Sequence, residues 1–598
     1  MSRKIIIGRE LTASEISLIR YETEVDITCF EDISIPFESK IISLSADEKR
    51  EINYSTLGEI IGFGDKILRG QSLVKHLQIG RSSIWHYHKF RTYFFVRNLN
   101  YELVQLKKVG VENASVNFYC SSEFRFLQQD FPKINFIFPE KKKEPINWVL
   151  AFKYLIFLKL RIVSSIVTRF SSSDILIYYP ERYNPLLDLK TLEPKDGNFL
   201  LDYLFTQSKS PLNLIGEVPV PKLKSKAGFP LQAGYFKTSE SGHPKKNMES
   251  ILARYGWSAW RQAKKEGNIL KQKYIELLAE SLSLNEKLAL RFVQSLHSSS
   301  VFYLVRYFAA RKFFSRHKFR VLLATDENSP LTKSVIDAAK DFGVKTVGMQ
   351  HGTMHDLHPA YLYTKEDVRQ GVIPDFTLTW GTYWEKFLIE KGNYPAEKVI
   401  SVGHLRTDII PKLLEEKNPV SEKFRLVFAS QPQRDPVLRR QAAFDVFSAT
   451  RKFSDIELVV KLHPREYDED GYYRQIAREA DCSNFRIDKN TDLYELIASC
   501  DALITCFSTV GTETVYFSKP LIILDHLMQD IQGYYKEGVA FRAVNSSELT
   551  TLISGLKNGE LHLNDNACKK FIEKYSYRID SRVAKRVEEF LNRISRAD

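Results

Sequence analysis

Short apolar runs that end in a polar or glycine-containing turn recur through the second half of this 598-residue chain. The clearest example lies between Cys500 and Asp525, where the run from Ala502 to Thr505 predicts a buried parallel strand. Ser508 and Thr509 follow as a polar turn before a short helix that contains Glu513. A strand, a hydroxyl-rich turn and a helix N-terminus in this order direct free N–H groups towards an anion. The alternative is a serine that caps an ordinary crossover helix.

The same order of features recurs at five other places. The turn residues that follow the predicted strands are Asp326-Glu327, Gln350-His351-Gly352, Gly403 to Asp408, Ser430-Gln431 and His463-Pro464. Open α/β sheets bind their ligands outside the carboxyl ends of their strands. We therefore expect an α/β fold with its functional side chains gathered at these strand ends.

The length of the chain exceeds what one hydrophobic core supports, so several domains are expected. Predicted short strands alternate with helices near the N-terminus, for example at Lys4–Ile7 and Val25–Phe30, which indicates a small α/β layer there. We predict an N-terminal α/β extension over 1–170, ending in an apolar and basic helix. A first Rossmann-like domain is predicted over 171–415 and a second over 416–598.

The net charge of +13 is concentrated in the first two-thirds of the chain. Residues 1–415 hold 59 Lys and Arg against 45 Asp and Glu, whereas residues 416–598 hold 27 against 28. A basic surface suits nucleic acid, anionic lipid or an acidic polymer. The chain lacks the patterns of RNA-recognition domains, zinc fingers and basic helices, so we expect no nucleic-acid partner.

The cysteine pattern and the N-terminus both favour the cytoplasm. Six cysteines are scattered without a close CxxC pair, which argues against a zinc site or a disulfide framework. The first residues, MSRKIIIGRELTASE, lack the apolar core and cleavage site of a signal peptide.

A strongly apolar segment from about residue 145 to residue 170 is interrupted by Lys153, Lys159 and Arg161. Charges in mid-span argue against a transmembrane helix. Two interpretations stay open. The segment is an interfacial helix on an anionic inner-membrane surface, or it is a helix buried between domains. The first interpretation implies a cytoplasmic protein that is peripheral on the inner membrane.

The sequence also lacks several motifs that would indicate another chemistry. It has no P-loop and no Rossmann GxGxxG, which disfavours kinases and dehydrogenases. No acidic triplet of the D-x-D kind follows a predicted strand; Asp468-Glu469-Asp470 lies in a polar loop. We expect no metal and no cofactor.

Taken in order, the strand-end motifs of residues 319–598 resemble those of bacterial GT-B glycosyltransferases of surface polysaccharide synthesis. The similarity is greatest to capsule enzymes of the polysialyltransferase and Kdo-transferase type, and CDP-glycerol glycerophosphotransferases are more distant. One departure is that Asn328 follows Asp326-Glu327, where the sialyl enzymes carry a glycine after the acidic pair.

This resemblance implies two Rossmann-like domains that face a cleft, and a metal-independent enzyme. It implies catalysis by Asp326 or Glu327 as the base, with His351 as the competing candidate. Arg406 is expected either to touch the donor or to brace the hinge. The expected donor-binding residues are His463, Pro464, Ser430, Arg406, Ser508, Thr509 and Glu513.

The leading hypothesis is a glycosyltransferase that moves a sugar from a CMP- or UDP-type nucleotide donor to a surface polysaccharide or lipid-linked acceptor. The second is a CDP-glycerol-type polyol-phosphate transferase on the same scaffold, in which His351 and His463 perform the chemistry. A sugar-nucleotide epimerase is disfavoured because those chains are shorter and lack the N-terminal region. The transferase hypotheses require His463 and Ser508 to share one cavity that faces the half of the molecule containing Glu327.

Overall fold

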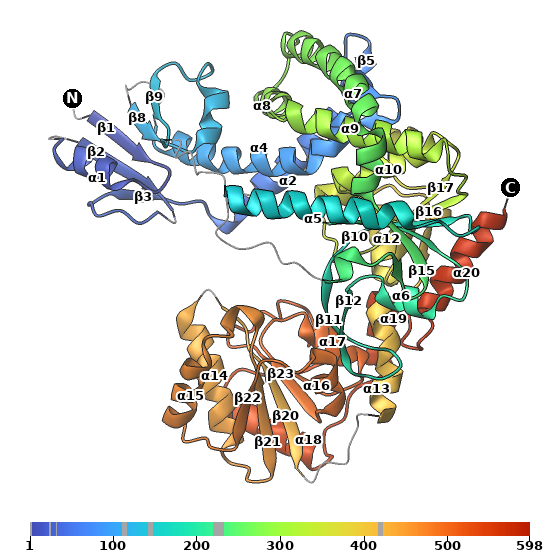
Figure 1. Ribbon diagram of the computed structural model, residues 1–598. Helices are drawn as coiled ribbons and strands as arrows, with labels where there is room; N and C mark the ends of the chain where they lie inside the picture. The colour runs from blue at the N-terminus through green and yellow to red at the C-terminus, as the bar shows by residue number, and fades with distance from the viewer. Residues whose placement is uncertain are drawn as a thin grey trace.

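The computed structural model describes residues 3–22, 25–31, 33–110, 116–140, 147–218, 233–416, 423–433 and 435–597. In this part of the chain, three larger sheets of five, eight and six strands form successive α/β units (Figure 1). An α/β fold with two Rossmann-like domains and an N-terminal α/β unit was expected, and the strand order of the sheets confirms it.

The N-terminal sheet is parallel and has the strand order β3-β2-β1-β8-β9. Its strands are β1 (Arg3–Ile7), β2 (Val25–Phe30), β3 (Lys40–Ile42), β8 (Val116–Tyr119) and β9 (Ile134–Ile137). The long helix α4 (Ile84–Lys108) joins this unit to the rest of the molecule, because Trp85 and Tyr87 are buried in a core shared with the following domain. The N-terminal unit is therefore anchored by packing as well as by chain connectivity.

The middle sheet has the order β14-β15-β13-β10-β16-β17-β18-β19, and every pair except β14–β15 is parallel. Its strands are β10 (Ile175–Pro180), β13 (Asn213–Glu217), β14 (Ser239–Glu240), β15 (His243–Asn247), β16 (Val321–Thr325), β17 (Lys345–Met349), β18 (Phe376–Thr379) and β19 (Val399–Ser401). All five residues of β16 are buried, as is typical of a parallel strand covered on both faces. The strand order reverses between β10 and β16, which makes this the topological switch point of the sheet.

Helices cover the faces of the middle sheet. Those that contact it include α7 (Met248–Leu278), α10 (Pro330–Lys340) and α12 (Thr382–Glu390). Behind them, α9 (His297–Phe314) packs on α7 and α10, and α8 (Leu284–Ser295) packs on α7 and on α4.

The C-terminal sheet is fully parallel, with the order β22-β21-β20-β23-β24-β25. Its strands are β20 (Phe424–Ala429), β21 (Ile456–Lys461), β22 (Phe485–Asp488), β23 (Ala502–Thr505), β24 (Leu521–Leu524) and β25 (Phe541–Ala543). The helices around it are α14 (Pro436–Thr450), α15 (Asp470–Glu479), α16 (Leu493–Ser499), α17 (Val510–Tyr516), α18 (Ser546–Lys557) and α19 (Asp565–Ser576). The order reverses between β20 and β23, as it does between β10 and β16 in the middle sheet.

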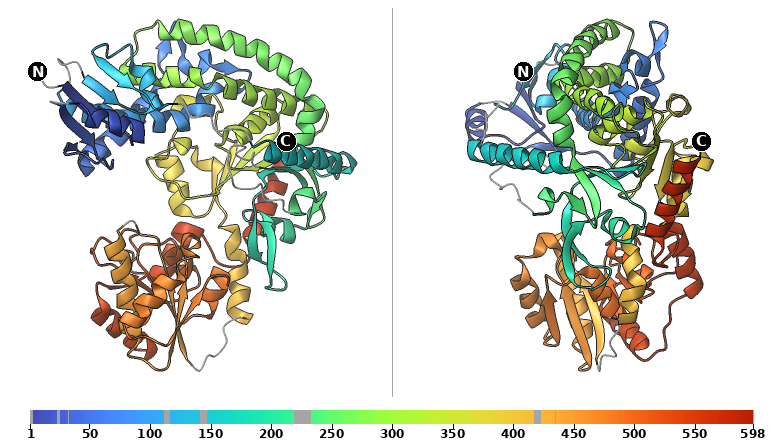
Figure 2. Two further views of the ribbon diagram at one scale, coloured as in Figure 1. Left: turned by 60° about the vertical axis from the view of Figure 1, so that its left-hand side comes forward. Right: turned by 45° about the vertical axis from the view of Figure 1, so that its right-hand side comes forward.

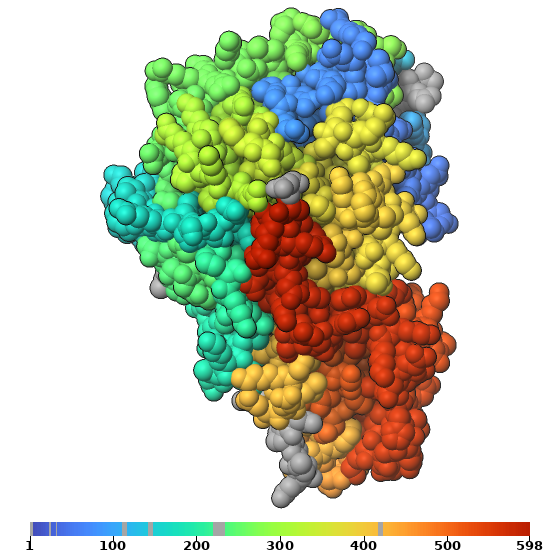
Figure 3. Space-filling model, turned by 90° about the vertical axis from the view of Figure 1, so that its right-hand side faces the viewer, coloured from blue at the N-terminus to red at the C-terminus, as the bar shows by residue number. Residues whose placement is uncertain are grey.

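Two elements cross between the middle and C-terminal units. The last helix, α20 (Val583–Arg596), returns to the middle sheet, where Val587 and Leu591 share a core with Ile177 of β10. Figure 3 shows this helix in red against the upper half of the molecule. In the opposite direction, the hairpin β11 (Tyr183–Leu187) and β12 (Pro194–Asn198) extends from the middle unit to the C-terminal one (Figures 1 and 2).

The predicted domain boundaries remain predictions. The boundary at 415 and 416 lies beside residues 417–422, which are outside the described residues. The path of α20 was not indicated by the sequence, because a C-terminal amphipathic helix carries no local signal of the sheet on which it packs. By its packing, α20 belongs with the middle unit.

Candidate functional site

The first group of candidate residues lies where β16 ends, at the switch point of the middle sheet. Asp326 adopts a left-handed backbone conformation, with φ of +58°, which is uncommon for a residue other than glycine. This turn separates the two acidic side chains, since that of Asp326 is partly exposed and that of Glu327 is fully buried. A Cβ atom at Gly348 on the neighbouring β17 would lie 3.0 Å from Cγ of Glu327, so the glycine makes room for this carboxyl group.

His351 brings the two acidic residues into one cluster. It follows β17, and its Nε2 atom lies 3.4 Å from Oδ1 of Asp326. Its Nδ1 atom lies 3.9 Å from Oε2 of Glu327, too far for a hydrogen bond. Among the described residues, neither oxygen of the Glu327 carboxyl group has a hydrogen-bond partner. The three residues predicted to be catalytic therefore lie together.

Burial dominates the acid–base behaviour of this cluster. Removal from water, together with a smaller contribution from the nearby charge of Asp326, raises the pKa of Glu327 to about 8. Burial also raises the pKa of Asp326, against the opposing influence of His351 and Arg182, and it lowers the pKa of His351. At neutral pH, the carboxyl group of Glu327 accordingly holds a proton.

Arg182 is a neighbour of this cluster that the sequence placed only in a polar turn. It follows β10, on the other side of the switch point, and its Nη2 atom lies 3.8 Å from Oδ2 of Asp326. Its side chain is 58% exposed, so the guanidinium group is accessible to a bound molecule. In the sequence, only its position just after a strand pointed to a role for Arg182. Its proximity to Asp326 could not be predicted, because it depends on the pairing of β10 with β16.

The second group of candidate residues surrounds an open cavity of about 470 Å³ at the carboxyl edge of the C-terminal sheet. Ser430, His463, Pro464 and Ser508 all line it, so the requirement that His463 and Ser508 share one cavity is met. The tip of the β11–β12 hairpin forms another part of the wall, through Pro185, Leu186, Leu187 and Pro194. The cavity is thus built from the C-terminal unit and from one element of the middle unit.

A hydrogen-bonded network fixes the backbone around His463. The Ser430 hydroxyl donates to Oε2 of Glu466 at 2.6 Å and accepts from the backbone N–H of His463 at 3.0 Å. The backbone N–H of Arg465 donates to Nδ1 of His463 at 3.1 Å. The neutral imidazole must then carry its hydrogen on Nε2, which makes that atom a donor. Pro464 begins the 3₁₀ turn η6 (Pro464–Glu466) that holds this geometry.

Two lysines that the sequence analysis did not identify, Lys461 and Lys489, line the cavity, and each is also paired with a carboxylate, that of Asp488 or Asp470. Nζ of Lys461 donates to the carbonyl oxygens of Thr491 and Lys489 at 2.7 and 2.9 Å, and it lies 3.5 Å from Oδ1 of Asp488. Burial lowers the pKa of Lys461. Lys489 also lines the cavity. Their signal in the sequence was weak, since a lysine at the end of a strand is common on solvated surfaces.

The remaining donor-binding candidates lie around this cavity without all reaching it. Ser508 accepts a hydrogen bond from the backbone N–H of Val510 at 3.3 Å, in the turn that opens α17. Thr509 is exposed at the start of the same helix. The residues of the described chain that line the cavity do not include Thr509 or Glu513. Burial raises the pKa of Glu513, while the nearby charge of Arg406 lowers it.

Arg406 lies at the junction of the two units. Its guanidinium group is 4.7 Å from the ring centre of Phe199, which follows β12, and 4.5 Å from that of Tyr494 on α16. It is also 3.7 Å from a carboxylate oxygen of Asp492 and 4.0 Å from one of Glu513. This position between two rings and two carboxylates favours the bracing role over direct contact with a donor.

A continuous set of contacts links the two groups. The backbone N–H of Phe199 donates to the carbonyl oxygen of Arg182 at 3.2 Å, and Arg182 lies beside Asp326. Phe199 in turn packs on Arg406, whose neighbour Asp492 lines the larger cavity. A movement of the hairpin would therefore displace residues both near Asp326 and around the larger cavity.

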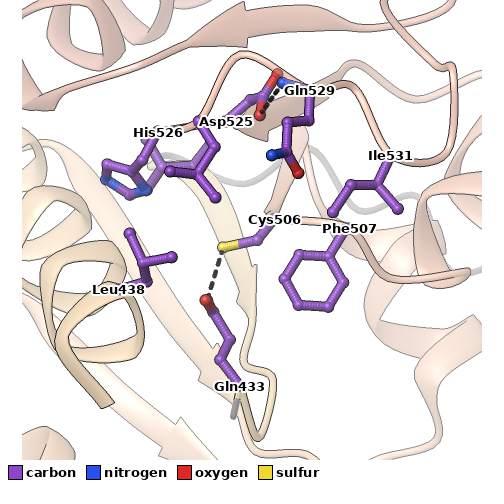
Figure 4. A pocket seen from close by; sticks show the side chains of 10 residues that line it. Gln433, Leu438, Cys506, Phe507, Asp525, His526, Gln529 and Ile531 are labelled. Atoms are coloured by element: carbon purple, nitrogen blue, oxygen red, sulfur yellow. Dashed lines mark hydrogen bonds between the residues drawn. The ribbon is translucent and has the colours of Figure 1, made fainter. Parts of the chain in front are cut away.

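A smaller cavity of about 50 Å³ lies on the other side of the C-terminal switch point (Figure 4). The side chain of Gln431 helps to close the switch point, because its Oε1 accepts from the backbone N–H groups of Cys506 and Phe507 at 3.1 and 2.9 Å. His526, which lines the smaller cavity, is paired with Asp445 at 2.9 Å. This space holds no more than a few water molecules, so the larger cavity is the candidate for a nucleotide.

Among the described residues, no group of three His, Cys, Asp or Glu side chains is placed to hold a metal ion. In the same part of the chain, no helix combines the length and mean hydropathy needed to cross a bilayer.

Comparison with known proteins does not assign the chain to a family. No family model and no curated protein matches it. A UDP-GlcNAc 2-epimerase from Neisseria meningitidis, bound to UDP-GlcNAc, is 10% identical over 70% of this chain and 99% of its own, with a TM-score of 0.41. The epimerase from Methanocaldococcus jannaschii has the same identity and coverage, with a TM-score of 0.42.

The wall teichoic acid polymerase TagF is 12% identical over 75% of this chain and 96% of its own, with a TM-score of 0.38. Likenesses this distant carry no argument about function. The chain is an α/β protein of two Rossmann-like domains with an N-terminal α/β unit, and its strand-end clusters are the basis for any proposal about its activity.

Proposed function

We propose that the chain is a glycosyltransferase that moves a sugar from a CMP- or UDP-type nucleotide donor to a surface polysaccharide or a lipid-linked acceptor. The observation that carries the proposal is the pair of chemically different clusters at two equivalent switch points. One holds two carboxyl groups and an imidazole, and the other holds an imidazole, a hydroxyl group and two lysines. Glycosyl transfer needs both, because a hydroxyl group loses a proton while a phosphate leaves.

In this proposal the nucleotide end of the donor occupies the cavity of about 470 Å³. Nε2–H of His463 and the hydroxyl group of Ser508 donate to the phosphate, and Lys461 and Lys489 supply positive charge. Donors fixed in advance around a developing charge are an effective source of catalysis. Glu513 is proposed to accept a hydrogen bond from a ribose hydroxyl group, for which its side chain must give up its proximity to Arg406.

The acceptor end is proposed to lie over Asp326 and His351. The acceptor oxygen forms a bond to the anomeric carbon of the donor, and its proton passes to the carboxylate of Asp326. The bond from the anomeric carbon to the phosphate oxygen breaks, and its electron pair leaves with the phosphate. Glu327, with a pKa of about 8, holds a proton at neutral pH and is suited to accept one only in more alkaline solution.

The second candidate is a CDP-glycerol-type polyol-phosphate transferase. It would use the same clusters, but the bond that breaks is a phosphorus–oxygen bond within the diphosphate. The presence of one histidine in each cluster, His351 and His463, is the observation that keeps this candidate. Calorimetric titration with CDP-glycerol and with CMP- and UDP-sugars separates the two candidates by the donor that binds.

The direct test is turnover of these donors by the wild-type chain and by His463→Ala and Asp326→Asn. We expect turnover of one donor class by the wild type and a loss of at least about tenfold in both variants. Matched controls are His562→Ala and Glu397→Gln, since both residues are exposed and lie outside the two clusters. Wild-type rates in both cluster variants would exclude this mechanism.

A further inference from the structure

Helix α5 (Trp148–Val167) carries an apolar face that remains open to solvent. Trp148, Phe152 and Val167 are 75%, 65% and 74% exposed. The helix runs across the outside of the molecule in both Figure 1 and Figure 2. The exposed apolar residues recur at helical spacing and form one continuous stripe: Trp148, Val149, Phe152, Leu155, Ile156, Leu160, Val163, Ile166 and Val167.

The opposite face of α5 fixes the orientation of this stripe. Arg161 is completely buried, and its guanidinium group donates to both carboxylate oxygens of Glu181 at 3.1 and 2.9 Å. The same group also donates to Glu249 at 3.1 Å. Turning the helix to bury the stripe would remove Arg161 from both partners, at a large cost for a buried charge. The exposure of the stripe is therefore a stable feature of the fold.

The charge around the stripe is positive. Helix α5 contains no Asp or Glu, and its exposed charged side chains are Lys153 and Lys159. A cavity of about 410 Å³ separates α5 from the start of α7 and is lined by Ile166, Lys246 and Arg254 among others. One acidic residue, Glu249, lies within the first turns of α7, and it is bound to Arg161.

Aromatic side chains follow on α7 beside further positive charges. The exposed rings of Trp257 and Trp260 stack with their centres 5.3 Å apart. The guanidinium group of Arg261 lies 5.2 Å from the ring centre of Trp257, and Nζ of Lys264 lies 5.1 Å from that of Trp260. Tryptophan rings next to basic side chains are typical of protein surfaces at the headgroup level of a bilayer.

We propose that α5 and the first turns of α7 dock on the surface of an anionic lipid bilayer, with α5 lying in the plane of the interface. Apolar side chains enter the boundary of the acyl chains, and the lysines and arginines contact anionic headgroups. A second copy of the chain is a poor occupant, because the two faces would bring positive charges together. This inference goes beyond the proposed function and does not rest on it.

The test is flotation of the full-length protein with vesicles of phosphatidylcholine, with and without roughly one-third phosphatidylglycerol. We expect the wild type to float with the anionic vesicles, and more weakly with neutral vesicles or at high salt. The double variant Phe152→Glu/Leu160→Glu should bind at least about tenfold more weakly, because it places two carboxylates at the interface. Both residues are exposed, so the fold should be kept.

A matched control is Leu18→Glu/Ile67→Glu, which replaces two apolar residues of comparable exposure outside α5 and α7. This variant should float like the wild type. Flotation of the α5 variant at the wild-type level, or no flotation of the wild type, would overturn the proposal. Light scattering identifies the other occupant: a wild-type dimer that the α5 variant dissociates, without vesicle binding, would assign the face to a second copy. Donor turnover in solution, measured on the same samples, reports separately on the proposed function.

Discussion

The two switch points of this molecule share a topology and differ in chemistry. At the end of the middle sheet, one buried and one partly exposed carboxyl group lie near a neutral imidazole, and burial has raised the pKa of Glu327 to about 8. At the end of the C-terminal sheet, an open cavity is surrounded by lysines, a hydroxyl group and an imidazole that donates through Nε2. Strand order sets where each cluster forms, while the residues just after each strand set whether it carries carboxyl groups or lysines and a hydroxyl group.

The largest effect is expected from the substitution Asp326→Asn, which tests whether this cluster accepts the proton. Asparagine tolerates the left-handed backbone at this position, so the fold should be kept. Removal of the proposed base should lower kcat by about 10²–10⁴-fold, while the affinity for the donor nucleotide stays within a factor of about two. Steady-state kinetics and calorimetry measure the two quantities. An unchanged kcat would remove Asp326 from the chemistry.

The matching change in the other cluster is His463→Ala. Loss of the Nε2 donor should lower kcat by about 10²–10³-fold and should also weaken nucleotide binding. His562→Ala, in the same unit, is the control. If binding and turnover both survive the change, the cavity is not the donor site.

A third prediction concerns Ser430, which holds the loop of His463. Its hydroxyl hydrogen is already donated to Glu466. Ser430→Ala removes a hydrogen bond to the buried Glu466 carboxylate and one from the His463 backbone. The free energy of unfolding should fall by about 1–3 kcal/mol, measured by urea denaturation. Ser547→Ala, at an exposed position on α18, should change it by less than about 0.5 kcal/mol. Equal stabilities of the two variants would show that the hydrogen bonds of Ser430 to Glu466 and His463 do not stabilise the fold.

A fourth prediction concerns the pH dependence of stability. Burial raises the pKa of Glu327 in the folded state to about 8, from an ordinary value of 4.5, so the folded protein binds a proton more tightly than the unfolded chain. This contribution is fully present below pH 4.5 and is lost as the pH rises to about 8. Tm should therefore decline less steeply across this range in Glu327→Gln than in the wild type. Parallel Tm profiles for the two proteins would contradict burial of an uncompensated carboxyl group.

Much of this architecture was accessible from local sequence patterns. The strand expected over residues 320–324 is β16 (Val321–Thr325), and the run from Ala502 to Thr505 is β23. Fully buried parallel strands appear as short apolar runs, and their polar turns mark the carboxyl edge of the sheet. The sharing of one cavity by His463 and Ser508 follows from this regularity.

Other features depend on contacts between residues far apart in the sequence. Arg182 reaches Asp326 because β10 pairs with β16, and Arg406 lies between rings supplied by two different units. The orientation of α5 was also open, since the sequence suited both an interfacial and a buried helix. The ion pairs of Arg161 with Glu181 and Glu249, which lie on other elements, fix which face of α5 is buried. Local periodicity does not contain such information.

The most direct test is calorimetric titration of CMP or UDP, whichever the wild type binds, into the wild type, His463→Ala and Asp326→Asn. It measures whether one cluster binds the phosphate while the other accepts the proton. We predict that His463→Ala binds the nucleotide at least about tenfold more weakly and that Asp326→Asn binds it like the wild type, although both lose turnover. Equal loss of binding in the two variants, or equal retention, would contradict this division of labour.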